Sequence, residues 1–163
     1  MFARVLKYNP YHDELGRFTT ADGAAAMAAN PISVEHLHEI YREVSKPDGG
    51  FTYQPVTKHS PTKGFAVSPY PERSFAKPVK DFTFSDLVDY AIKNRDAFAN
   101  RDHYLGGWHD PASGKVFLDV SVVKQDRKEA HALALAKDQI AYFDLETFES
   151  VTVNAKATSG GAA

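Results

Sequence analysis

An alternating run of residues in the C-terminal half restricts what this chain can fold into. From Val116 to Val122 every second residue is Val or Leu, whereas Phe117, Asp119 and Ser121 stand between them. Because successive strand residues point to opposite faces, this period of two predicts a strand with one buried face. The run follows another stretch of strand formers, HYLGGWH, and the turn residues of DPASGK separate the two. Together they predict a β-hairpin.

Other segments carry helix and strand signals. Apolar residues recur at helical spacing after Ser33, after the Thr83–Asp86 start signal and between Asp126 and Ala136, which predicts three amphipathic helices. Further strands are expected over residues 51–54, 64–68, 139–145 and 150–153, the first two paired as a loose hairpin and the last two as a closing hairpin.

The order of these elements predicts an α+β domain with a mostly antiparallel sheet and helices packed on one face. The helix between the 116–122 run and the 139–145 strand leaves one parallel pair open, so that the sheet is either antiparallel or mixed. We expect residues 31–154 to form one domain. Residues 1–30 are polar and Ala-rich and read as an extended arm or docking peptide, and residues 155–163 as a flexible or partner-bound tail.

Composition excludes several classes of function. The chain has 163 residues, a formal net charge of −2 and no cysteine. The charge makes nucleic acid an unlikely partner, and the lack of cysteine removes disulfides, thiolate metal sites and a cysteine nucleophile. No run is long and apolar enough for a membrane span, so no membrane partner is expected. Phosphate-loop, dinucleotide and zinc-protease motifs are missing, and we expect no cofactor.

Histidine patterns do not favour a metal site. His36 and His38 are two positions apart and would point in different directions on a helix, unlike the i, i+4 pair of helical zinc motifs. His12 stands beside Asp13 and Glu14 in the arm, where a fixed coordination shell would be hard to hold.

Two segments carry candidate catalytic residues. HYLGGWHD places His103 and His109 on one strand with a double glycine between them, and PYPERS places Arg73 in an irregular stretch. A histidine can act as a general base and an arginine can stabilise a developing negative charge, so these three would be the site if the chain is an enzyme. For HYLGGWHD, the structural alternative is that its aromatic residues belong to the core and its glycines form a bulge. For Arg73, the alternative is a pair with Asp119 that locks the loop onto the sheet.

The opening stretch KYNPYHDELGRFTT supplies the clearest resemblance. Its Asn-Pro, His-Asp and Gly-Arg-Phe-Thr pattern resembles a short segment of tailed-bacteriophage head proteins, in particular MuF-type minor capsid proteins. The resemblance covers residues 7–23, and the pattern comprises Asn9, Pro10, His12, Asp13, Gly16, Arg17, Phe18 and Thr19. It implies a docking peptide in which Asn9, Pro10, His12, Asp13, Arg17 and Phe18 bind phage capsid or head proteins. The globular part is loosely similar to domains that phages carry beside such proteins, some of them assigned to compact nuclease folds.

These observations favour a virion-associated structural protein, either a capsid decoration protein or a minor head component. It would be made in the bacterial cytoplasm, located in the phage head and docked through its arm, with oligomeric contacts made only in the assembly. An enzymatic activity is not the favoured interpretation. The alternative is a phage-encoded effector, either a small RNA-cleaving enzyme or an inhibitor of a host factor.

Overall fold

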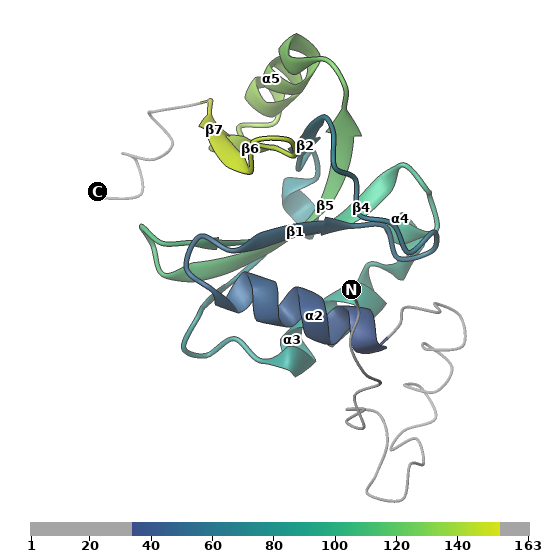
Figure 1. The fold of residues 1–163 in the computed structure, drawn as a ribbon, viewed down its shortest axis with the longest axis vertical. Coiled ribbons are helices and arrows are strands. Elements are labelled where there is room, and N and C mark those ends of the chain that lie inside the picture. The colour runs from purple at the N-terminus through teal and green to yellow at the C-terminus, as the bar shows by residue number, and fades with distance from the viewer. Residues whose placement is uncertain (1–33, 154–163) are drawn as a thin grey trace, which may run out of the picture.

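The structure is a computed structural model that describes residues 34–153 (Figure 1). The arm predicted over residues 1–30 and the tail predicted over residues 155–163 lie outside the described residues. The same is true of the six residues predicted to bind a partner: Asn9, Pro10, His12, Asp13, Arg17 and Phe18.

The described part of the chain contains both helices and strands, in mixed order. The helices are α2 (Val34–Ser45), the 3-10 helix η1 (Pro71–Arg73), α3 (Phe84–Lys93), α4 (Arg95–Phe98) and α5 (Arg127–Ala136). The strands are β1 (Gly50–Tyr53), β2 (Phe65–Val67), β3 (Phe75–Pro78), β4 (His103–Asp110), β5 (Lys115–Lys124), β6 (Ala141–Asp144) and β7 (Glu149–Thr152).

Side-chain caps begin two of the helices where the sequence predicts them. At α3, Asp86 N donates to Thr83 Oγ1 over 3.3 Å, and Thr83 N donates back to Asp86 Oδ2 over 2.7 Å. At α5, the Asp126 carboxylate accepts from the backbone N–H groups of Lys128 and Glu129. These bonds satisfy N–H groups that the first turn of a helix leaves without a partner.

The sheet is antiparallel at every pairing between the described strands. Its order is β1-β4-β5-β2-β6-β7, and β3 also pairs with β5. The open question of a parallel pair is resolved because β2 lies between β5 and β6. The hairpins β4–β5 and β6–β7 confirm the predicted ones.

The predicted loose hairpin of residues 51–54 and 64–68 is wrong. β1 pairs with β4, whereas β2 pairs with β5 and β6. The long β4–β5 hairpin lies between the two short strands. β1 pairs with one side of this hairpin, at β4, and β2 pairs with the other side, at β5. The segment between β1 and β2 contains Pro55 and Pro61, which lack the N–H group that a continued ladder needs.

Strands β2 and β3 share one edge of β5 and are separated by a loop. Val67 is opposite Val122 and Phe75 is opposite Leu118, so that residues 68–74, which include η1, stand opposite residues 119–121. The chain therefore leaves the sheet edge and returns to it. This excursion is what positions Arg73 and Ser74.

The α-helices of residues 34–153 pack on one face of the curled sheet, as predicted. Val116, Leu118 and Val120 of β5 are buried in a cluster with residues of α2, α3 and α4. Val122 continues the same alternation and belongs, with Val67 of β2, to a second cluster under α5. Figure 1 shows α2 and α3 on one side of the β1–β4–β5 region and α5 beyond β2 and β6.

The other face of the sheet carries the residues that alternate with this core. Thr52, Gly106 and Asp119 form a row across β1, β4 and β5, and Trp108 is paired with Phe117 in the next row. We call this surface, with Ser121, the Asp119 face. None of the helices between residues 34 and 153 is long and apolar enough to cross a membrane.

Candidate functional site

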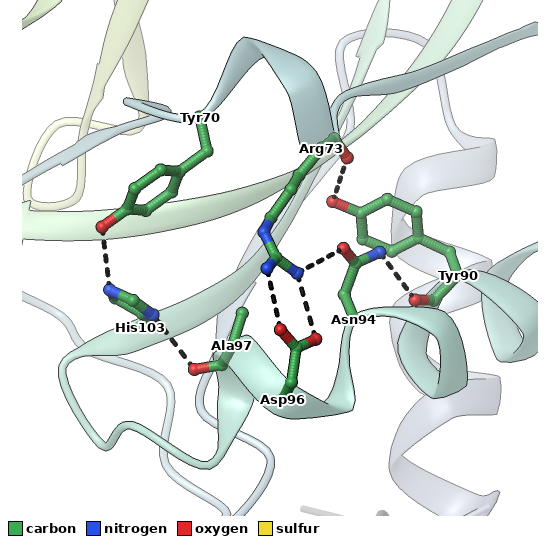
Figure 2. Close-up of polar contacts among 7 residues, drawn as sticks. All are labelled: Tyr70, Arg73, Tyr90, Asn94, Asp96, Ala97 and His103. Carbon is green, nitrogen blue, oxygen red and sulfur yellow. Dashed lines mark hydrogen bonds and ion pairs between the residues drawn. The ribbon is translucent and has the colours of Figure 1, made fainter.

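His103 and Arg73 approach the short helix α4 from two sides (Figure 2). His103 begins β4, and its Nδ1 lies 3.0 Å from the carbonyl oxygen of Ala97. Its Nε2 lies 3.0 Å from the hydroxyl of Tyr70. Since a carbonyl oxygen only accepts, Nδ1 carries the proton, and in the neutral ring Nε2 accepts from Tyr70. Both ring nitrogens are thus engaged within the protein.

Arg73 is held by a set of bonds that connects η1 with α3 and α4. Its guanidinium donates to both carboxylate oxygens of Asp96, over 3.0 and 2.8 Å, and to Asn94 Oδ1 over 3.2 Å. Asn94 is buried and donates to Tyr90 O, while the Tyr90 hydroxyl donates to Arg73 O over 2.9 Å. Figure 2 shows that these bonds form a closed circuit.

The charges in this circuit are mutually stabilised. The side-chain hydrogen bond between Arg73 and Asp96 raises the pKa of the guanidinium and lowers the pKa of the carboxyl. Burial raises the pKa of Tyr90 strongly, so that its hydroxyl remains a proton donor. The arrangement places Arg73 where it stabilises the fold rather than where it meets an incoming anion.

The predicted Arg73–Asp119 pair is wrong. Arg73 extends over the helix-covered face toward α4, whereas Asp119 points to the opposite face of the sheet. Ser74, the residue after Arg73, donates to Asp119 Oδ1 over 2.6 Å. Adjacent residues of the returning chain point to opposite sides, so only one of the two can reach Asp119.

His109 is not brought to the other two candidates. It lies near the far end of β4, is buried, and its Nδ1 donates to Lys46 O over 2.9 Å. His103 and His109 are separated by six residues of one strand, about 20 Å at the usual rise per residue. The structure therefore brings together His103 and Arg73 but not the full set of candidates.

The double glycine is not a bulge. Pairing between β4 and β5 continues without interruption from His103 opposite Val122 to Asp110 opposite Lys115. A Cβ atom at Gly107 would overlap the Phe51 ring, and one at Gly106 would lie 2.6 Å from Ser121 Oγ. The glycines are therefore required for close packing across strands, which the sequence did not reveal.

Trp108 and Tyr104 are half-buried on the Asp119 face and are not core aromatics. The Trp108 ring stacks on Phe117 with 6.3 Å between the centroids, and its Nε1 donates to Asp48 Oδ1 over 3.0 Å. The indole ring thus stands at the side of the face with one surface against Phe117. Trp108 can therefore serve as a fluorescent reporter for the Asp119 face.

Asp119 differs from its sequence-based expectation, because its partner is Ser74 rather than Arg73. It is partly exposed, yet the surrounding protein desolvates it, and burial raises the pKa of its carboxyl. The hydroxyls of Ser74 and Ser68 oppose that rise. Ser68 also lies 3.3 Å from Ser121 across the strand. The signal in the sequence was a carboxylate at an outward position between aromatic and hydroxyl residues of one strand.

A shallow polar pocket of about 450 Å³ continues this face at the C-terminal end of β5. Tyr104 and Val123 line it from the sheet, and Lys63, Asp102 and Gln125 line it from the loops. Its charged groups are of both signs. This does not favour a strongly acidic or basic ligand.

No group of three or more His, Asp or Glu side chains that could hold a metal ion occurs among residues 34–153. His36 Nδ1 lies 3.0 Å from the Tyr53 hydroxyl, and the His38 ring stacks on Phe84 at 3.8 Å. These two histidines pack against different aromatic side chains, in line with their expected divergence.

Comparison with known proteins adds no family assignment: no family model, no curated protein and no solved structure matches this chain.

Proposed function

We propose that this chain is a virion-associated structural protein of a tailed bacteriophage, a capsid decoration protein or minor head component that docks through its N-terminal arm. The observation that carries the proposal is the Asn-Pro, His-Asp and Gly-Arg-Phe-Thr pattern over residues 9–19. Its turn residues, the apolar anchor Phe18 and the single guanidinium of Arg17 are the parts of a short docking peptide.

The arrangement at α4 supports a binding role over a catalytic one. Both ring nitrogens of His103 form hydrogen bonds with other residues of the domain. The Arg73 guanidinium likewise donates to residues of the domain. A general base needs a nitrogen within hydrogen-bond reach of its substrate. Here Tyr70 would have to leave His103 before a substrate proton could be accepted. In this proposal the domain is a rigid body, and the arm attaches it to the phage head.

Quantitative mass spectrometry of purified particles tests the proposal. The amount of this chain is measured against the major capsid protein. A near-stoichiometric ratio is expected for a shell component. Absence from particles, or a handful of copies, would contradict a shell role and favour a packaged or intracellular effector.

Substitutions in the arm make the test specific. Arg17→Gln and Phe18→Ala each remove one proposed anchor, and we expect both to reduce incorporation into particles by about 10-fold, as loss of a central interface contact does. Leu135→Ala is the matched control, because this exposed side chain belongs to α5 of the domain and not to residues 1–30. Equal incorporation of all variants would contradict docking through the arm.

A small RNA-cleaving enzyme is the second candidate. One observation favours it: His103 and Arg73, a base and a phosphate-binding cation, both reach α4 (Figure 2). Ala97 and Asp96 occupy the space between them, so a substrate would need a rearranged α4. Cleavage of a labelled RNA that His103→Ala and Arg73→Gln abolish, and that His109→Ala leaves intact, would establish this function and displace the structural one.

A further inference from the structure

Asp119 has no cationic partner among residues 34–153. Elsewhere in this part of the chain Lys46 pairs with Glu43, Arg73 with Asp96 and Lys77 with Asp86. Asp119 instead accepts from the Ser74 hydroxyl over 2.6 Å. A neutral hydroxyl leaves the negative charge uncompensated in a partly desolvated place, which favours an approaching cation.

The residues beside Asp119 across the sheet are small. Its neighbours across the sheet are Gly106, which has no side chain, and the small buried Thr52. Ser121, two positions along β5, is also small and buried. Small residues therefore flank Asp119 across the strands, whereas Phe117 and Trp108 lie farther along the same face.

Aromatic rings beside a carboxylate favour a guanidinium over an ammonium. Phe117 is two positions before Asp119 on β5 and therefore points to the same face, with Trp108 stacked on it. A guanidinium can form paired hydrogen bonds with a carboxylate while its plane lies against a ring, whereas an ammonium binds as a point charge. Lys115 lies on the same face but at the end of β5, opposite Asp110.

We propose that the Asp119 face binds the arm of the same chain through residues 16–18. In this contact the Arg17 guanidinium pairs with the Asp119 carboxylate, and Phe18 packs beside Phe117 and Trp108. Arg17 is preferred over Arg4 because an aromatic residue follows it directly and a glycine precedes it, which allows close backbone approach.

The length of the arm permits this contact. Residues 19–33 connect the docking segment to α2. A flexible chain of this length spans about 20 Å on average and about 50 Å when extended. The radius of gyration of a domain of this size is about 14 Å. A tether of this kind gives an effective concentration near the millimolar range, which favours the same chain over a second copy.

The inference does not depend on the proposed function. If a head protein binds the same arm residues, it has to displace them from the Asp119 face. The arm would then be held on the domain until assembly. Failure of either claim leaves the other testable, because one is measured in particles and the other on the isolated full-length chain.

Disulfide trapping tests the contact directly, because the chain contains no cysteine. Thr19→Cys is combined with Ala76→Cys, an exposed small residue paired with Phe117 on the same face. The matched control combines Thr19→Cys with Leu135→Cys, which is exposed on α5 at the helix-covered face. Under mild oxidation of the dilute full chain, we expect the first pair to form an intrachain disulfide in about 10-fold higher yield.

Charge substitutions identify the partners. In the Thr19→Cys/Ala76→Cys background, Asp119→Asn or Arg17→Gln should lower the trapping yield by about 10-fold, because each removes a charge-assisted bond. Arg4→Gln should leave it unchanged. Asn keeps the shape of the aspartate and still accepts from Ser74, so loss of folding does not explain a lower yield; the circular dichroism spectrum checks this.

Quenching of the single tryptophan gives a second readout without cysteines. Trp108 lies on the face, so Arg17→Gln should make its fluorescence more accessible to acrylamide, whereas Arg4→Gln should not. Equal trapping of the two cysteine pairs, or insensitivity to Asp119→Asn, would overturn the proposal. Disulfide-linked dimers as the main product would assign the face to the arm of a second copy and would equally overturn it.

Discussion

The Arg73 guanidinium lies 2.8 Å from Asp96 Oδ2 and joins the loop between β2 and β3 to the short helix α4. The next residue, Ser74, turns the other way and reaches Asp119. One excursion of the chain therefore supplies a structural ion pair to one face of the sheet and a hydroxyl donor to the other. This division places the ion pair on the helix-covered face and the hydroxyl donor on the face proposed to bind the arm.

The Arg73–Asp96 pair should make a modest contribution to stability. In a double-mutant cycle with Arg73→Gln and Asp96→Asn, we expect a coupling free energy of about 0.5–1 kcal/mol, because the pair is partly exposed but has paired hydrogen bonds. Urea unfolding of the four proteins measures it. Arg95→Gln is the control for loss of a nearby positive charge, and additivity of the two substitutions would contradict the coupling.

The Asp119 carboxyl should make stability depend on pH in the direction opposite to the usual aspartate. Burial raises its pKa, so the folded state holds the proton more tightly than the unfolded chain does. Its contribution to stability is therefore fully present below the unfolded pKa of about 3.9 and is lost as the pH rises through the folded pKa. In the Arg17→Gln background, which removes the proposed arm contact, Asp119→Asn should be more stable than its parent at neutral pH.

The comparison of unfolding free energies at several pH values checks this prediction. The difference between Asp119→Asn and its parent should shrink as the pH falls toward about 3, where the parent carboxyl is also neutral. Asp96→Asn provides a control of opposite sign, because the Arg73 hydrogen bond lowers the pKa of Asp96 and the stability it supplies is lost as the pH falls. A constant difference across this range would contradict a raised pKa at Asp119.

Gly107→Ala should destabilise the protein because its methyl group would overlap the Phe51 ring. Overpacking of this kind costs about 1–3 kcal/mol. Gly114→Ala is a useful comparison: Gly114 has open space around its Cβ position but a φ of +67°, so its cost is backbone strain alone. Thermal unfolding should show a recovery for Gly107→Ala when Phe51→Leu is added, whereas Gly114→Ala should gain nothing from that change.

Thr83→Ala should weaken the start of α3 by about 1 kcal/mol, because it removes the hydroxyl that accepts from Asp86 N. Thr83→Ser, which retains the acceptor, should lose much less. Thr62→Ala is the matched control at an exposed loop position. If Thr83→Ala and Thr62→Ala have the same melting temperature, the cap has no measurable energetic role.

Local patterns in the sequence were sufficient for the fold class and for most of the elements, but they did not reveal η1, β3 or α4. The alternation at Val116–Val122 determined a strand with one buried face, and the caps at Thr83 and Asp126 determined where two helices begin. These signals are local. The direction of a side chain, and the hydrogen bonding of the backbone N–H groups in the first turn of a helix, depend on residues a few positions apart. The same locality explains why β4–β5 and β6–β7, joined by short turns, were predicted as hairpins.

Only the tertiary structure decided which distant segments meet. Strand β2 pairs with β5 and β6 rather than with β1, and Arg73 pairs with Asp96 rather than with Asp119. No local periodicity encodes these choices. They depend on which strand edges are available for pairing and on the side to which the chain turns when it returns to the sheet. The need for glycine at Gly107 depends on Phe51, far away in the sequence, and the lack of a cationic partner for Asp119 among residues 34–153 likewise depends on how distant segments pack. The sequence alone thus determined most of the elements and their order, and three-dimensional packing decided their partners and added β3, η1 and α4.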